Sequence, residues 1–94
     1  MLSGAILPGV YKVLFSKDAH KYYQRLPSNQ VKRIDDALAD LSHDPYQGGD
    51  IRKLKDMYGY YRLRVGDLRV IFEINEKNKA IWIDQILPRG QAYK

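Results

Sequence analysis

Hydrophobic and polar positions alternate most regularly between residues 60 and 74, where two apolar-rich runs flank the dipeptide Gly66-Asp67. Both runs contain many β-branched and aromatic residues with a period of two, which is typical of half-buried strands. A two-residue connection that contains glycine predicts a hairpin with a primed turn. Because this turn length sets the register, we predict the pairs Val65–Leu68, Arg64–Arg69, Leu63–Val70, Arg62–Ile71 and Tyr61–Phe72.

This register divides the hairpin into an apolar face and a basic face. The face that we expect to join the core carries Tyr61, Leu63, Val65, Leu68, Val70 and Phe72. The opposite face carries Tyr60, Arg62, Arg64, Arg69, Ile71 and Glu73. Arg64 and Arg69 would lie directly opposite each other with about 5 Å between their Cβ atoms, where like charges repel. Three crowded guanidinium groups therefore predict a site for an anionic ligand.

The residues before the hairpin predict one strand and two helices. Residues 11–15 alternate as a strand would, and Ser16 offers an N-cap hydroxyl to a short helix that begins near Lys17 and stops by Pro27. Ser28 is predicted to cap a second helix. Its apolar stripe has spacings of three and four and consists of Val31, Ile34, Leu38 and Leu41.

The remaining segments complete a small sheet. Turn residues at Asp44-Pro45 and Gly48-Gly49 mark a loop. We predict a short basic edge strand at residues 52–55 and a last strand at residues 80–86, antiparallel to 68–74. Residues 87–94 are expected to lack regular structure, and Trp82 to pack at the edge of the core. The order predicts an α+β fold, with two N-terminal helices on one face of a mainly antiparallel four-stranded sheet. The arginine-bearing surface would stay uncovered.

Length and composition limit the possible functions. The 94 residues suffice for one domain, predicted over residues 11–94 after a flexible leader at 1–10, and 45% of them are hydrophobic, which argues against disorder. No apolar run approaches the ~20 residues of a membrane span, and the leader lacks the basic start of a secretory signal, so we expect a cytoplasmic protein without a membrane partner. There is no cysteine, and the two histidines are far apart, so we predict no metal site and no cofactor.

The charge is unevenly distributed. Sixteen Lys and Arg residues against eleven Asp and Glu residues give a formal net charge of +5. The excess lies between Arg52 and Arg69, whereas residues 27–44 are slightly acidic. Such one-sided charge favours binding to a phosphate backbone or to an acidic protein. The alternative is that these arginines, like Lys53 and Lys55, only solvate the sheet surface and protect its edge.

The chain resembles the RelE/ParE toxin superfamily, and its RelE branch in particular. The resemblance rests on Lys53-Leu54-Lys55, on the hairpin string from Gly59 to Ile74, and on the terminal Arg89-x-x-x-Tyr93-Lys94. It covers about residues 11–94 and implies the RelE-like microbial RNase fold. The chain departs from the pattern at Pro88, where many members carry a histidine, and at Arg62 and Arg64, where some carry lysines.

The resemblance implies a toxin of a type II toxin-antitoxin system that enters the ribosomal A site and cuts mRNA without a metal. Its partners would be a cognate antitoxin, mRNA and the ribosome, and operator DNA only through the antitoxin complex. The catalytic residues carried over are Arg62, Arg64, Arg69, Arg89 and Tyr93. Arg52, Lys53 and Lys55 would bind RNA. The alternatives are a ParE-like DNA gyrase poison without nuclease activity, and an inactive toxin fold that serves as a binding partner.

These residue types suit RNA cleavage by attack of a 2′-hydroxyl on the neighbouring phosphate. The transition state gathers negative charge on the non-bridging oxygens, which the planar fork of arginine binds in bidentate fashion. We expect Arg69 to bind the scissile phosphate with Arg89, while Arg62 and Arg64 hold the flanking backbone. A guanidinium stays protonated, so none of the four is a conventional general base. Glu73 or the Tyr93 phenol could transfer a proton, and Tyr93 could instead stack on a base.

Overall fold

The computed structural model describes residues 10–46 and 50–91. Along these residues the chain forms β1 (Lys12–Phe15), α1 (Lys17–Gln24), α2 (Ser28–His43), β2 (Ile51–Lys53), β3 (Tyr60–Val65), β4 (Leu68–Asn75), β5 (Ala80–Pro88) and the 3-10 helix η1 (Arg89–Gln91). Except for the exposed Val10, the predicted leader lies outside the described residues. Within the described ranges, no helix is both long and apolar enough to cross a membrane.

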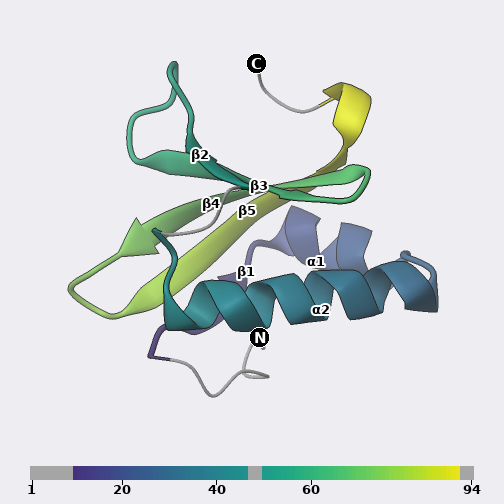
Figure 1. Ribbon diagram of the computed structural model, residues 1–94, viewed down its shortest axis with the longest axis horizontal. Helices are drawn as coiled ribbons and strands as arrows, with labels where there is room; N and C mark the ends of the chain where they lie inside the picture. The colour runs from purple at the N-terminus through teal and green to yellow at the C-terminus, as the bar shows by residue number, and fades with distance from the viewer. Residues whose placement is uncertain (1–9, 47–49, 92–94) are drawn as a thin grey trace.

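The strands described form one sheet in the order β1-β5-β4-β3-β2. β1 pairs with β5 in parallel, and every other neighbouring pair is antiparallel. In Figure 1, α2 runs below the sheet, and η1 lies on the upper side beside the β3–β4 turn. The predicted α+β fold is confirmed. The sheet nevertheless has five strands among the described residues instead of the predicted four, because β1 and β2 both join it as edge strands.

The two helices begin for different local reasons. The Ser16 hydroxyl accepts a hydrogen bond from the Ala19 N–H at 3.0 Å, so the predicted cap of α1 is confirmed. For α2 the predicted cap is wrong, because Ser28 is already helical and Pro27 is the N-cap residue, without a side-chain hydrogen bond. Proline at this position is extended, with ψ of 154°, which sets the direction from which the chain enters the helix.

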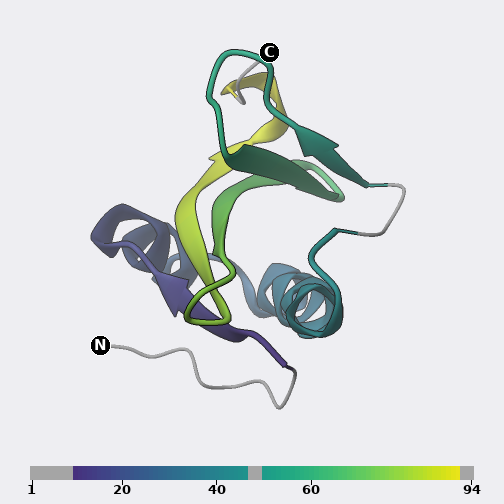
Figure 2. The same cartoon turned by 90° about the vertical axis from the view of Figure 1, so that its left-hand side faces the viewer.

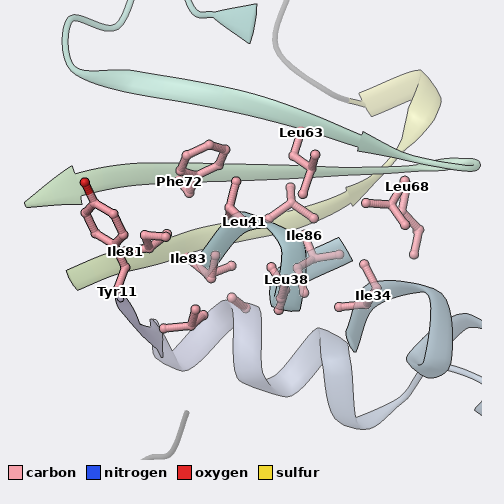
Figure 3. Packing of buried hydrophobic residues seen from close by; sticks show 14 residues of the cluster. Tyr11, Ile34, Leu38, Leu41, Leu63, Leu68, Phe72, Ile81, Ile83 and Ile86 are labelled. Carbon is pink, nitrogen blue, oxygen red and sulfur yellow. The ribbon is translucent and has the colours of Figure 1, made fainter. Parts of the chain in front are cut away.

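The core lies between the sheet and the helices, as Figure 3 shows. From α2 it receives the predicted stripe, of which Ile34, Leu38 and Leu41 are at most 2% exposed. From the hairpin it receives the apolar face, in which Phe72 is fully buried and stacks on Tyr61 with 5.5 Å between ring centroids. Neither α1 nor α2 covers the opposite sheet surface. Figure 2 shows that the sheet is strongly curved.

The predicted register of the β3–β4 hairpin is confirmed at all five pairs, from Tyr61–Phe72 to Val65–Leu68, and the pair Tyr60–Glu73 continues it. Gly66 has a φ of +58°, and Asp67 is not among the residues with positive φ. This combination is a type II′ turn, in which the first central position requires glycine. The turn therefore confirms the two-residue connection on which the basic face depends.

We predict that Gly66→Ala destabilises the fold by about 1–2 kcal/mol, because an L side chain is strained at this φ. Its Cβ would also lie 2.6 Å from Nη1 of Arg33, which would have to move. Gly90→Ala is the matched control, since its Cβ would meet nothing within 4 Å. Urea denaturation of the three proteins measures the effect, and equal midpoints for both variants would contradict the turn assignment.

A polar cluster around Glu76 joins three segments at the opposite end of the sheet. Its carboxylate accepts hydrogen bonds from the hydroxyls of Tyr11 (2.8 Å) and Tyr46 and from Nζ of Lys79 (2.9 Å). The hydrogen bond from Tyr46, followed by those from Lys79 and Tyr11, lowers the pKa of Glu76 from 4.5 to about 2. The cluster therefore ties the start of β1 and the loop after α2 to the β4–β5 turn.

The Glu76 cluster predicts an acid-sensitive contribution to stability. A carboxyl whose pKa is lower in the folded state stabilises the fold fully above its unfolded value, and this contribution is lost as the pH falls. The window here runs from about 4.5 down to about 2. Glu76→Gln should therefore be less stable than the wild type at pH 6, and the difference should shrink toward pH 2. Urea midpoints across this range test it, with Asp36→Asn as the control for an exposed carboxylate.

Candidate functional site

The sheet surface away from the helices, here called the arginine face, is built by strand register. Arg64 lies opposite Arg69, and Arg62 lies opposite Ile71. The same alternation places Leu87, Gln85 and Trp82 on this face, because they pair with Arg69, Ile71 and Glu73. The prediction that the hairpin arginines share one uncovered surface is confirmed. Arg64 is exposed, and Arg62 and Arg69 are partly exposed.

Arg69 stands at the centre of the positive charge. Its Nη1 donates to the carbonyl oxygens of Gly66 at 3.0 Å and Leu68 at 2.9 Å, so the guanidinium is held against the turn. These bonds use both hydrogens of Nη1. The edge formed by Nε and Nη2 remains for a ligand, and it has the fork geometry that binds phosphate oxygens. Burial lowers the pKa of Arg69, and the charges of Arg62, Arg64 and Arg89 lower it further. In the free protein, the positive charges of three other arginines therefore act on Arg69, and a bound anion would relieve this repulsion.

The two β3 arginines differ in their surroundings. Arg64 donates from Nη2 to Asp50 at 2.7 Å and from Nε at 3.2 Å, a pairing that sequence reasoning missed. In contrast, the Nε of Arg62 is buried and has no hydrogen-bond partner within the described part of the chain. A buried donor without a hydrogen-bond partner is costly. Arg62 therefore differs from Arg64, whose Nε donates to Asp50.

Arg89 reaches the site because residues 87–91 are more ordered than predicted. Residues 87–94 were expected to lack regular structure, but β5 continues to Pro88 and η1 covers Arg89–Gln91. For residues 87–91 the expectation was wrong, because Pro88 pairs with Leu68 and the Arg89 N–H donates to the carbonyl of Asp67 at 2.8 Å, whereas residues 92–94 lie outside the described residues. These contacts fix Arg89 beside the hairpin turn. Tyr93 lies outside the described residues.

The three residues predicted to bind RNA are not equally placed. Arg52 pairs with Arg62 across β2 and β3, which puts it on the arginine face. Lys53 pairs with Tyr61, so it belongs to the opposite side of the strand. Lys55 follows the strand and lines a hollow of about 230 Å³ with Tyr58. The arginine face therefore gathers Arg52 with the hairpin arginines but does not include Lys53.

Glu73 is displaced from the arginine centre. It lies four residues from Arg69 along β4, a separation of about 14 Å at the usual rise per residue. Ile71 stands between them and is fully buried although it faces away from the helices. A phosphate bound at Arg69 is therefore out of reach of the Glu73 carboxylate, and this position does not favour Glu73 as the general base.

The described residues contain no group of three or more His, Cys, Asp or Glu side chains placed to hold a metal ion. The chemistry that the arginine face can perform is binding and charge stabilisation. Its guanidinium groups can hold successive phosphates and stabilise charge that develops on one of them.

The family follows from comparison with known proteins. A family model, described as the ParE toxin of the type II toxin-antitoxin system parDE, matches residues 10–93. Toxin RelE3 of Methanocaldococcus jannaschii is 34% identical over 85 residues, which cover 87% of this chain and 94% of that protein. The chain therefore belongs to the RelE/ParE superfamily of toxins from type II toxin-antitoxin systems.

Solved structures agree with this assignment. The archaeal RelE-RelB complex from Pyrococcus horikoshii OT3 contains a chain that matches with a TM-score of 0.76 and 34% identity, over 88% of this chain and 99% of that one. A YoeB/ParE toxin from Agrobacterium tumefaciens matches with a TM-score of 0.72 at 22% identity, over 81% of this chain and 95% of that one. At this lower identity the second match shows a shared fold only.

Proposed function

We propose that this toxin is a metal-independent endoribonuclease that cuts mRNA in the ribosomal A site and so stops translation in the cytoplasm. The observation that carries the proposal is the cluster of Arg62, Arg64 and Arg89 around Arg69 on an uncovered sheet surface. Such a cluster is costly in the free protein, and a chain of phosphates offsets the cost. RelE-named proteins are among its relatives, which supports the same reading.

In the proposed reaction, a 2′-oxygen of the message attacks the adjacent phosphorus while the bond from phosphorus to the 5′-oxygen breaks. The products are a 2′,3′-cyclic phosphate and a 5′-hydroxyl, so one proton leaves the 2′-hydroxyl and one reaches the leaving oxygen. The Nε and Nη2 edge of Arg69 binds the non-bridging oxygens, with Arg89 beside it. Arg62, Arg64 and Arg52 hold the flanking backbone.

We assign proton transfer to no described residue. Arginine is not a conventional base, and Glu73 lies too far along β4. Tyr93 keeps its predicted role as a stacking or proton-donating residue at the end of the chain. Ribosome dependence fits this site, because the ribosome would supply the in-line alignment of the 2′-hydroxyl, and positioning contributes several kcal/mol to such reactions.

The proposed partner is a cognate antitoxin whose acidic side chains cover the arginine face. Relatives have been crystallised as RelE-RelB complexes, including the Pyrococcus horikoshii toxin. Because neither α1 nor α2 covers the positive face, an acidic segment would gain from complementary charge and exclude RNA. Operator DNA would be bound only through the toxin-antitoxin complex.

A second candidate function is poisoning of DNA gyrase without nuclease activity. It is favoured by the matching family model, which is described as a ParE toxin. In that case the arginine face would bind gyrase or its DNA and would perform no chemistry.

Primer extension on messages from cells expressing the toxin separates the two functions. We expect cuts within translated codons that disappear when translation initiation is blocked. Intact messages together with trapped gyrase-DNA breaks would reject the nuclease and support the gyrase poison. Co-expression of the neighbouring antitoxin gene should abolish either effect and serves as the control for toxicity.

A further inference from the structure

A hollow of about 760 Å³ opens at the far end of the arginine face and contains the single tryptophan of the chain. Its lining includes Lys12 and Leu14 from β1, Glu73 from β4 and Trp82 from β5. Trp82 was expected to pack at the core edge, but it is 40% exposed. An indole this exposed is not fully used in packing, and among the described residues none of the proposed catalytic set lines this hollow.

Strand register shows that the hollow and the arginines share one surface. Trp82 pairs with Glu73 on one side and with Leu14 on the other. A register shift between Ile71 and Phe72 lets Asp84 bulge, so that Ile83 and Ile86 both face the core while Trp82 faces away from it. An RNA strand that crosses the arginines could therefore continue to Trp82 without leaving the face.

The side chains around Trp82 match the parts of a nucleotide. Indole and the Leu14 side chain offer an apolar surface on which a base can stack. The carboxylate of Glu73 can accept hydrogen bonds from the amino group of a base, and it takes part in none of the three ion pairs among the described residues. Lys12 adds an exposed cation for a phosphate. The other carboxylate of the hollow, Glu76, is occupied by its tyrosine and lysine partners.

We propose that Trp82 and Glu73 form a nucleobase subsite for the same RNA strand that the arginines cleave. The inference rests on the proposed function. Trp82 supplies the stacking platform, and Glu73 selects bases that carry an amino group (adenine, cytosine and guanine) over uracil. The subsite lies about 14 Å from Arg69 along the sheet, so it binds a neighbouring nucleotide and not the one that is cleaved.

Fluorescence offers a direct test, because Trp82 is the only tryptophan. The probes are short 2′-O-methyl oligonucleotides, which have no 2′-hydroxyl to attack and stay intact. We expect oligonucleotide binding to quench the fluorescence emission of Trp82. An oligonucleotide with an abasic unit at the position that reaches Trp82 should restore this emission. Fluorescence anisotropy should show that the abasic oligonucleotide still binds and that this binding still depends on Arg69. If the oligonucleotide binds, and Arg69→Ala weakens this binding, but the emission of Trp82 does not change, the subsite is overturned. The nuclease proposal would then still stand. Quenching by an antitoxin peptide but not by RNA would assign the hollow to the antitoxin instead.

Cleavage on the ribosome gives the second test and also applies if the free toxin binds no oligonucleotide. Trp82→Leu should lower kcat/KM by about 5- to 100-fold, the loss typical of one stacked base, whereas Trp82→Phe should keep most of the activity. Glu73→Gln should raise cleavage of messages with uracil at the subsite relative to cytosine, because an amide can donate as well as accept. If Trp82→Leu cleaved with the kinetics and base preference of the wild type, the inference would be overturned. If the wild type itself did not cleave mRNA on the ribosome, the proposed function would be rejected.

Discussion

Arg69→Ala is expected to lower the rate of mRNA cleavage by about 10²–10³-fold, by analogy with the loss of one oxyanion-hole donor. Arg69 is the guanidinium on which the charges of Arg62, Arg64 and Arg89 converge. Its hydrogen bonds to two turn carbonyls hold the guanidinium in place before the substrate arrives. We therefore expect Arg69 to stabilise the transition state more than the bound substrate. Single-turnover cleavage on message-loaded ribosomes measures the change in rate.

The matched control for Arg69→Ala is Lys32→Ala, which removes one positive charge from α2 on the helix side. The Lys32 side chain is 80% exposed and pairs with Asp36 at 3.9 Å, so its loss should leave cleavage unchanged. Urea denaturation of both variants checks that the fold is intact. Growth arrest that persists in an Arg69→Ala, Arg89→Ala double variant would contradict the site assignment.

Phe72→Ala is expected to cost about 3–5 kcal/mol of stability, the usual range for removing a buried phenylalanine. Phe72 is fully buried, stacks on Tyr61 and lies in the core beneath the arginine face. For a domain of this size the loss is a large part of a total of about 5–15 kcal/mol, so much of the variant should be unfolded at 37 °C.

Urea midpoints of Phe72→Ala and Phe72→Leu measure this core contribution. The leucine variant keeps most of the apolar volume and should lose much less stability. If both variants unfolded at the wild-type midpoint, Phe72 would not be packed as described. A loss of cleavage in Phe72→Leu at full stability would mean that the core residue also positions the site.

The hairpin was predictable because short-range rules determine it. A two-residue turn with glycine first sets the register, and the register determines the face on which each side chain lies. The pairing of Arg64 with Arg69 and the burial of Val70 and Phe72 both follow from that turn. The stripe of α2 was predictable for the same reason, because its spacing matches one side of a helix.

The missed features depend on contacts between distant segments. The parallel pairing of β1 with β5, the pairing of Pro88 with Leu68 and the ion pair of Arg64 with Asp50 have no local pattern. The position of Trp82 did leave a trace in the sequence. Ile83 and Ile86 are three residues apart, a spacing that a regular strand cannot bury on one face, and it indicates the bulge at Asp84.

Cleavage by the arginine face is tested most directly by the chemistry of the RNA ends that purified toxin produces on ribosomes loaded with a defined message. We predict a 2′,3′-cyclic phosphate on the upstream fragment and a 5′-hydroxyl on the downstream fragment, both lost in Arg69→Ala. Fragments with a 5′-phosphate, or a message that stays intact in the ribosomal A site, would contradict cleavage by the arginine face.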